Sequence, residues 1–171
     1  SSAASDVYKR QTIEGNTIER NGGEGVFVGD SSEAEIINNR ITDNKPNAEG
    51  KFGDGIEVVE NGKVTIRNNT ITGNARLGVG LWDNAQAKIQ SNTITKNKSH
   101  GVNIGYSGTS GETVQAEFLD NVINDNGGCG LSIDDDPGIR ITGTGNETRG
   151  NTYDGICGPG AGKVPYDFWK R

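Results

Sequence analysis

A six-residue phrase, Asn-x-Ile-x-x-Asn, recurs along this chain with its internal spacing unchanged, and no other feature constrains the fold as strongly. Five complete copies are present, beginning at Asn16, Asn39, Asn69, Asn92 and Asn121. A sixth copy opens as Asn151-Thr152-Tyr153, so successive copies start 23, 30, 23, 29 and 30 residues apart. A unit this short cannot bury its own apolar side chains, so each copy has to stack on the next. The repeat therefore predicts a solenoid.

Two further patterns recur between the copies of the phrase. One is Gly-apolar-x-apolar, the alternation of a half-buried strand, found at residues 25–28, 55–58, 78–81, 101–104 and 130–133. The other is a short strand signal at residues 34–36, 64–66, 87–89, 116–118 and 139–141. With the strand inside the phrase itself, each repeat has three strands and three bends. This predicts an all-β fold, a right-handed, single-stranded parallel β-helix of about six coils starting near Thr12.

The two Asn positions of the phrase are expected to form ladders along this β-helix. We place the first Asn at the bend between the second and third strands, where Asn tolerates a left-handed backbone. Stacked coils lie about 4.8 Å apart, so the side chains of equivalent Asn residues can hydrogen-bond to one another. The predicted core comprises Val26, Val28, Ile56, Val58, Val79, Leu81, Val102, Ile104, Leu131 and Ile133 from the first sheet, and Ile18, Ile41, Ile71, Ile94 and Ile123 from the third.

On these residues the chain resembles the pectate-lyase-like β-helix superfamily. It is especially similar to the right-handed β-helix repeat group that includes the nitrous-oxide accessory periplasmic proteins. The resemblance covers residues 12–158 and rests on the repeat length and both Asn positions. It implies the fold but no single activity, because the superfamily holds pectate lyases, polygalacturonases, alginate lyases, mannuronan epimerases and phage tailspikes.

The two ends of the chain depart from the repeat. Residues 1–11 are similar to the in-frame translation of a transposase sequencing adapter. We therefore expect them to be a scar on an environmental, microbial sequence that is truncated upstream of Thr12. Residues 159–171 hold three aromatic side chains and are expected to form a capping tail that shields the edge of the last coil. A sugar-binding aromatic cluster is the alternative for this tail.

Composition bears on partners and location. The net charge of −6 and the pI near 4.8 argue against nucleic acid and anionic membrane as partners, and no apolar run approaches the length of a membrane span. We expect a secreted, periplasmic or surface protein whose signal peptide is missing through truncation. Cys129 and Cys157 lie about one repeat apart, so stacking can bring them onto neighbouring coils, where a disulfide forms if the protein is exported. Two small buried thiols are the alternative.

The outward positions of the first sheet are the candidate substrate surface, because the substrate of the resembled enzymes lies along this sheet. Asp54 and Glu57 are candidates for the acid and base that act on a glycosidic bond. Trp82 can stack on a sugar ring, and with Asn103 and Asp83 it makes up the candidate substrate-binding set. The alternative is that these acids are the ordinary water-facing charges of an acidic solenoid.

His100 is the third catalytic candidate. The segment Ser99-His100-Gly101-Val102-Asn103-Ile104-Gly105 resembles the Gly-His-Gly-x-Ser-Ile-Gly segment of polygalacturonases, and this implies an active-site histidine. The Asp-Asp pair expected one coil earlier is replaced by residues 77–82, Leu-Gly-Val-Gly-Leu-Trp. No Arg or Lys occupies an outward position of the first sheet, so the cationic base of a pectate-type lyase is also missing. A surface histidine without a role is the alternative.

Asp134, Asp135 and Asp136 enter one tight turn and are the candidate site for Ca²⁺, which prefers oxygen ligands. Acids that simply face water are the alternative. We hypothesise a carbohydrate-associated module that binds or processes a polysaccharide along the first sheet; a catalytic form would be a polysaccharide lyase, glycoside hydrolase or epimerase. The alternative is a non-catalytic structural, adhesin or phage tailspike-like solenoid.

Overall fold

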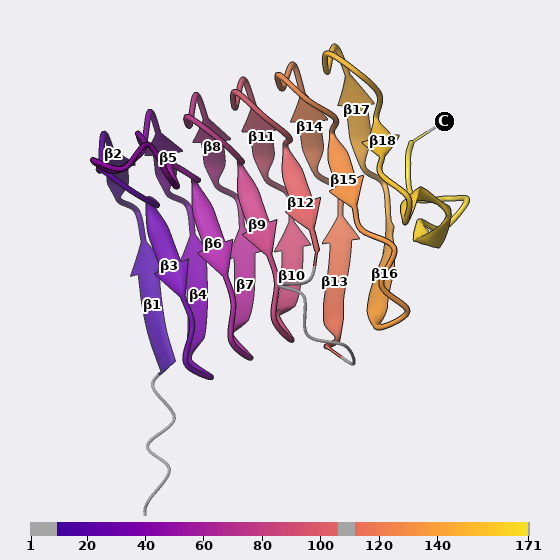
Figure 1. Ribbon diagram of the computed structural model, residues 1–171, viewed down its shortest axis with the longest axis horizontal. Coiled ribbons are helices and arrows are strands. Elements are labelled where there is room, and N and C mark those ends of the chain that lie inside the picture. The colour runs from indigo at the N-terminus through magenta and orange to yellow at the C-terminus, as the bar shows by residue number, and fades with distance from the viewer. Residues whose placement is uncertain (1–9, 106–111, 171) are drawn as a thin grey trace, which may run out of the picture.

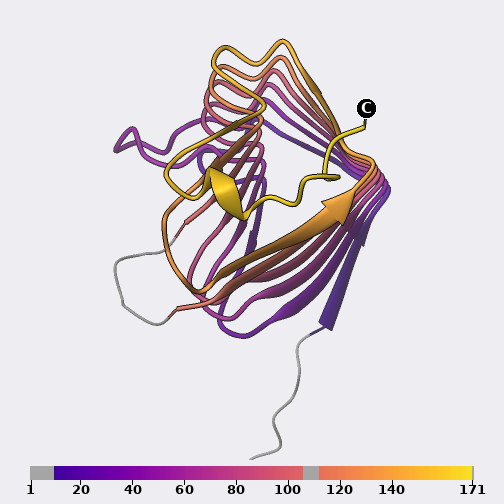
Figure 2. The same cartoon turned by 90° about the vertical axis from the view of Figure 1, so that its right-hand side faces the viewer.

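The computed structural model describes residues 10–105 and 112–170, which form a six-coil parallel β-helix (Figure 1). Each coil contributes one strand to each of three six-stranded parallel sheets, and seen along the stack the coils superimpose (Figure 2). The predicted fold class is confirmed. Residues 1–9, most of the segment 1–11, lie outside the described residues, whereas Arg10 and Gln11 belong to the first strand. Within the described ranges, no helix has the length and apolarity needed to cross a bilayer.

The first sheet follows the Gly-apolar-x-apolar pattern. The apolar residues point inward, as with Val79 and Leu81, which have no exposed surface. The glycine is needed because the coils approach closely here: a Cβ on Gly78 would lie 2.5 Å from the carbonyl oxygen of Gly101. The strands are β3 (Val26–Val28), β6 (Ile56–Val58), β9 (Val79–Leu81), β12 (Val102–Ile104), β15 (Leu131–Ile133) and β18 (Ile156–Cys157).

The second sheet has the longest strands and the third sheet carries the middle of the Asn phrase. The second sheet consists of β1 (Arg10–Glu14), β4 (Glu33–Ile37), β7 (Lys63–Arg67), β10 (Gln86–Gln90), β13 (Val114–Leu119) and β16 (Ile139–Thr144). The third consists of β2 (Thr17–Glu19), β5 (Arg40–Thr42), β8 (Thr70–Thr72), β11 (Thr93–Thr95), β14 (Val122–Asn124) and β17 (Glu147–Arg149).

The core is a stack of aliphatic side chains inside the three sheets. Ile36, Ile66, Ile89 and Phe118 are aligned in register on the second sheet and are fully buried. Burying one such side chain contributes about 2 kcal/mol. All the predicted core residues are buried except Ile18, which is half-buried because it lies in the first described coil and has a neighbouring coil on one side only.

Both Asn ladders are present, but the sixth copy of the phrase begins at Asn146 and not at Asn151. Asn121 Nδ2 donates to Asn146 Oδ1 at 2.9 Å, and Asn126 Nδ2 donates to Asn151 Oδ1 at 3.0 Å. Asn151 is therefore the second Asn of this copy. The prediction was wrong because Thr148 stands where the other copies have Ile, and its hydroxyl donates to the carbonyl oxygen of Ile123 instead of filling the core.

At the two bends that flank the third sheet, the left-handed residue is the one before the Asn, which corrects the role assigned to the first Asn. Asn68 has φ 56°, for example, whereas Asn69 does not have a positive φ. Asn69 is needed for hydrogen bonding: its backbone N–H and its Nδ2 both donate to Asn92 Oδ1, at 2.9 and 3.0 Å. The left-handed residues are Gly15, Asn38, Asn68, Ser91, Asp120 and Gly145 at one bend, and Arg20, Asp43, Gly73, Lys96, Asp125 and Gly150 at the next.

The end of the chain continues the first Asn ladder by one rung. The carbonyl oxygen of Phe168 accepts from the backbone N and from Nδ2 of Asn146, at 3.1 and 3.2 Å. In the other coils the Oδ1 of the next Asn accepts these two bonds. The Phe168 ring is buried against Phe118, with centroids 5.4 Å apart, and a 3₁₀ turn, η1 (Ala161–Lys163), precedes it. The tail thereby covers the core at the end of the last coil.

Candidate functional site

A cluster of charged side chains lies on the outer face of the first sheet, centred on Glu57. Glu57 is the middle residue of β6 and points outward, yet it is only 8% exposed. Asp54 is fully buried and paired with Arg76, whose Nε donates to Asp54 Oδ1 at 2.7 Å while Nη2 donates to Asp54 Oδ2. The backbone N–H of Leu77 also donates to Asp54 Oδ1, at 2.9 Å. Asp54 thus holds Arg76 in position and has little capacity left for a substrate.

Arg76 also reaches Glu57, with Nη2 3.5 Å from Glu57 Oε1. The sequence pattern missed this cation because Arg76 lies two residues before Gly78, outside the outward positions of the strand. One signal could have pointed to it. Asp54 lies next to a strand whose residues face the core, and a carboxylate buried there needs a positively charged partner.

Glu57 is also within hydrogen-bonding reach of the carboxyl group of Glu24. Glu24 Oε1 is buried and accepts no hydrogen bond from a backbone or side-chain donor in the described part of the chain. Two carboxyl groups can share a hydrogen bond only if one holds a proton. Burial first, and then the negative charges of Glu24 and Asp54, raise the pKa of Glu57 to about 7, against the opposing effect of Arg76. Glu57 can therefore gain or lose a proton near neutral pH, as a general acid or base must.

The contact between Glu24 and Glu57 follows a diagonal that recurs on this sheet. The residue before the strand's glycine in one coil meets the middle strand residue of the next coil. The same diagonal joins Cys129 to Cys157, which form a disulfide with Cα atoms 6.0 Å apart. The predicted closeness of the two cysteines is confirmed. The sequence repeat aligns only equivalent positions of successive coils. Glu24 and Glu57 occupy different positions of the repeat, so the repeat did not identify them as neighbours.

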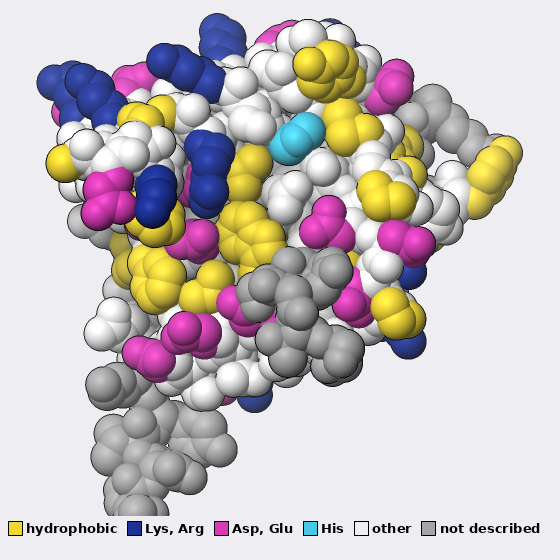
Figure 3. Space-filling model, viewed as in Figure 1, with side chains coloured by type: hydrophobic (Ala, Val, Ile, Leu, Met, Phe, Trp, Pro, Cys, Tyr) yellow, Lys and Arg dark blue, Asp and Glu magenta, His cyan; other side chains and the backbone are white. Residues whose placement is uncertain are grey.

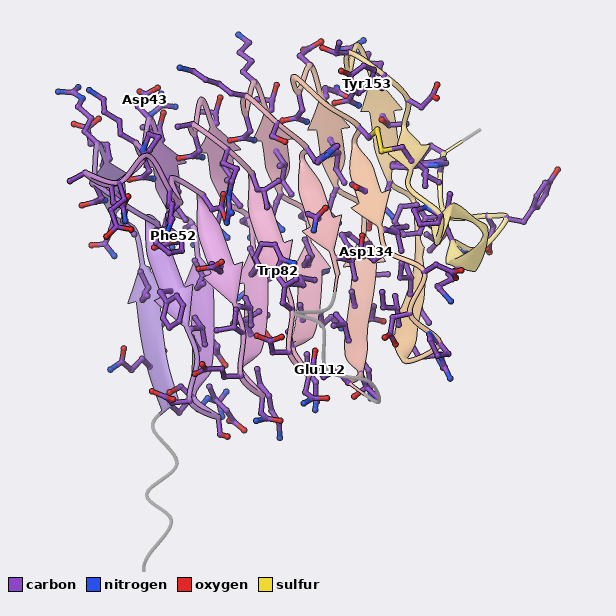
Figure 4. The ribbon with its side chains drawn as sticks, in the orientation of Figure 1. Asp43, Phe52, Trp82, Glu112, Asp134 and Tyr153 are labelled. Carbon is purple, nitrogen blue, oxygen red and sulfur yellow. A yellow bond between two sulfur atoms is a disulfide. The ribbon has the colours of Figure 1, made fainter. Side chains whose placement is uncertain are left out.

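Trp82 lies beside the Glu57 cluster and packs against Gly80 and Gly105. Its ring covers Gly80, and its Nε1 would be 2.9 Å from a Cβ on Gly105, with Asp134 Oδ2 2.6 Å from that same point. The Arg76 guanidinium stands 5.6 Å from the centroid of the Trp82 ring, a cation–π contact. Trp82 and Asp134 therefore converge from different coils over Gly105; both side chains are labelled in Figure 4.

Two exposed phenylalanines add apolar surface on this face, where yellow and magenta side chains alternate in Figure 3. Phe27, the β3 residue in register with Glu57, is 56% exposed, and Phe52 is 40% exposed. Phe52 projects from the longest loop of the second coil and lines an open hollow of about 450 Å³ that is shared with Arg76. Phe27 therefore lies beside Glu57 on the neighbouring strand, and both Phe52 and Trp82 lie beside Arg76, the ion-pair partner of Glu57.

The profile described as "Right handed beta helix region" matches residues 4–163. This chain belongs to the right-handed β-helix family. No curated protein matches it.

The remaining predicted residues of this right-handed β-helix are spread along the first sheet. Asn103 is the half-buried middle residue of β12, and Asp83 lies at the bend after β9 with φ 51°. Asp83 Oδ1 is buried without a hydrogen-bond donor among the described residues. His100 belongs to the coil of Asn103, about 10 Å along the β-helix from the coil of Asp54 and Glu57 at 4.8 Å per coil. The three catalytic candidates therefore do not form one cluster.

The three consecutive aspartates of the candidate Ca²⁺ site have separate environments. Asp134 faces Trp82 across Gly105, Asp135 is exposed with Lys163 Nζ at 3.9 Å, and Asp136 is buried and accepts from the backbone N–H of Gly138 at 2.6 Å. In the described part of this β-helix, one group of three His, Cys, Asp or Glu side chains has its potential ligand atoms within 4.8 Å of one another: His100, Cys129 and Cys157.

Proposed function

We propose that this β-helix binds a polysaccharide along the outer face of the first sheet. The single observation that carries the proposal is the pairing of Trp82 with the neighbouring Glu57 cluster. Sugar sites combine an aromatic face, which stacks on the apolar side of a sugar ring, with polar groups that hydrogen-bond to hydroxyls. Trp82 supplies the first, and Glu24 and Glu57 supply the second.

The charges on this face favour a neutral glycan over a polyuronate. Arg76 is the cation within the cluster, and the buried carboxylate of Asp54 already neutralises it. The other charged groups beside Trp82 are the carboxylates of Asp83 and Asp134. A substrate that carries one carboxylate per sugar would be repelled by these carboxylates. Lys51, the other cation that lines the hollow at Phe52, is already paired with Glu49 at 3.2 Å.

A second candidate function is cleavage or modification of the bound glycan, and one observation favours it. Glu57 titrates near pH 7 because it is buried beside Glu24 and Asp54. A carboxyl group that stays protonated up to neutral pH can protonate the leaving oxygen of a glycosidic bond. A glycoside hydrolase would use Glu57 in this way, whereas a binding or adhesin module would not. An epimerase breaks no glycosidic bond, and a lyase needs the carboxylate-bearing sugars that this face disfavours.

The disulfide between Cys129 and Cys157 supports a location outside the reducing cytoplasm, because such bonds persist in oxidising compartments. We propose a secreted, periplasmic or surface location on this ground. A soluble polysaccharide or a cell-wall glycan would be accessible to the protein there.

The test is binding of neutral, amino-bearing and uronic oligosaccharides, measured by calorimetry. We expect a neutral oligosaccharide to bind and Trp82→Ala to weaken its binding about tenfold, the loss of one stacking contact of about 1.4 kcal/mol. Tyr153→Ala is the matched control, since Tyr153 is 71% exposed and lies away from the cluster (Figure 4). Absence of binding by every neutral glycan, or unchanged affinity in Trp82→Ala, would contradict the proposal.

Cleavage is tested separately by following new reducing ends or unsaturated products from a glycan that binds. Glu57→Gln should abolish product formation while keeping affinity within a few fold. If the wild-type protein binds the glycan but forms no product, the protein is a binding module for that glycan and not an enzyme that acts on it.

A further inference from the structure

Three metal-ligating side chains meet at one place on the first sheet, apart from the Glu57 cluster. His100, Cys129 and Cys157 come from three successive coils, and one ring nitrogen and the two Sγ atoms lie within 4.8 Å of one another. Cys129 is buried, whereas His100 and Cys157 are partly exposed, so solvent reaches the group from one side. The two cysteines are joined by the disulfide in this state.

The imidazole of His100 is held as a neutral ring that faces the cysteines. Its Nδ1 accepts a hydrogen bond from the backbone N–H of Cys129 at 2.9 Å. An accepting Nδ1 carries no proton, so the ring presents a lone pair towards the cysteines. Gly128 makes room for the ring, because a Cβ at that position would lie 2.6 Å from Nδ1.

We propose that reduction of the Cys129–Cys157 disulfide converts this group into a Zn²⁺ site with two thiolates and one imidazole. This inference is independent of the proposed carbohydrate function. Zn²⁺ favours tetrahedral sulfur and nitrogen ligands, with Zn–S near 2.3 Å and Zn–N near 2.0 Å, so its ligand atoms are roughly 3.5 Å apart. The ligand atoms already lie within 4.8 Å of one another, and opening the S–S bond frees both cysteine side chains to rotate towards this spacing, with water in the fourth position.

The backbone keeps the two thiols together after reduction. β15 and β18 pair in parallel, with Leu131 opposite Ile156 and Ser132 opposite Cys157. The backbone N–H of Gly130 also donates to the carbonyl oxygen of Asp154 at 2.9 Å. The two coils are thus joined without the disulfide. Coordination through Nδ1 would replace its hydrogen bond from the Cys129 N–H.

The chemistry balances with a dithiol as the reductant. The dithiol gives two electrons and two protons, the S–S bond breaks, Cys129 and Cys157 become thiols, and the reductant closes to its own cyclic disulfide. Binding of Zn²⁺ then displaces one proton from each thiol, and two protons are released to solvent. Oxidation of the two thiolates would reverse the process and expel the metal.

The experiment uses Co²⁺ as a spectroscopic probe and Zn²⁺ as its competitor. The protein is reduced with dithiothreitol, desalted without oxygen and checked for two free thiols and an unchanged far-ultraviolet circular dichroism spectrum. We expect one equivalent of Co²⁺ to bind with sulfur-to-metal charge-transfer and tetrahedral d–d absorption, and Zn²⁺ to displace it. The oxidised protein should show neither band.

Two variants identify the ligands. His100→Ala should weaken Co²⁺ binding at least about tenfold and alter the d–d bands, and Cys129→Ser/Cys157→Ser should remove the charge-transfer band. Lys98→Ala, an exposed residue of the same coil, is the control. The proposal is overturned if the reduced protein unfolds, if it binds no stoichiometric metal, or if His100→Ala leaves both affinity and spectrum unchanged.

Discussion

Replacing Glu57 with Gln should change how the stability of the protein depends on pH. Glu57 has a pKa of about 7 in the folded protein and an ordinary value of 4.5 in the unfolded chain. Between these values the folded protein holds a proton that the unfolded chain has released. The free energy of unfolding therefore falls as the pH rises from 4.5 to 7. Gln resembles the protonated carboxyl group at every pH, so Glu57→Gln removes this loss.

The magnitude follows from the size of the pKa difference. A shift of about 2.5 units corresponds to roughly 3 kcal/mol, at 1.36 kcal/mol per unit. Glu57 is 8% exposed, so solvent screens its interactions little. We expect Glu57→Gln and the wild-type protein to be equally stable within about 1 kcal/mol at pH 4.5. At pH 8 the variant should be more stable by about 2 to 3 kcal/mol.

The assay is urea denaturation at several pH values from 4.5 to 8 under oxidising conditions. Glu117→Gln is the matched control, because Glu117 is a half-exposed carboxylate of β13 that pairs with Lys88 at 3.2 Å. Its curve should run parallel to that of the wild-type protein. Burial lowers the pKa of His100, which gives a slope of opposite sign below pH 6.5, but this contribution is common to all three proteins and cancels in the differences. Parallel curves for Glu57→Gln and the wild type would refute the assignment of a shared proton to Glu24 and Glu57.

Three further substitutions test the core, the Asn ladder and the packing of Trp82 on Gly80. Ile94→Ala, at a fully buried position of β11, should lower the free energy of unfolding by about 2 to 5 kcal/mol in urea, while the exposed Thr93→Ala should change it by less than about 1 kcal/mol. Asn92→Ala removes the acceptor of the Asn69 N–H and the donor to the Ile66 carbonyl oxygen, and should cost at least about 3 kcal/mol; a loss below about 1 kcal/mol would show that the ladder is not needed. Gly80→Ala puts a Cβ against the Trp82 ring and should displace it, which is visible as a shifted tryptophan emission in a Trp169→Phe background; an unchanged emission would contradict the packing of the ring.

The fold was predictable from sequence because it repeats. Every coil needs an Asn at each ladder position and a Gly before its first-sheet strand. The same residue types therefore recur at the same positions of each repeat. The exception shows the limit of this reasoning. Thr148 replaces the Ile of the phrase in the last coil, and without that residue the copy that begins at Asn146 was not recognised.

The candidate site was predictable only in part, because its contacts join different coils at an offset. Glu57 and Trp82 were identified from the outward alternation of their strands. The partnership of Glu57 with Glu24 depends on the diagonal between neighbouring coils, and Arg76 reaches the site from outside the strand. The three aspartates at 134–136 illustrate the opposite error: neighbours in sequence turned out to have separate partners.

The Asn ladders give the protein a unit of length. Every rung offers an acceptor to the coil before it and donors to the coil after it, and the Phe168 carbonyl oxygen takes the last donors of the first ladder. A whole coil could therefore be duplicated or deleted between two rungs without leaving a buried amide unpaired, whereas loss of half a coil would break both ladders. Proteins built in this way should differ from one another by entire coils, with the variation of 23 to 30 residues per coil absorbed in loops such as the one that carries Phe52.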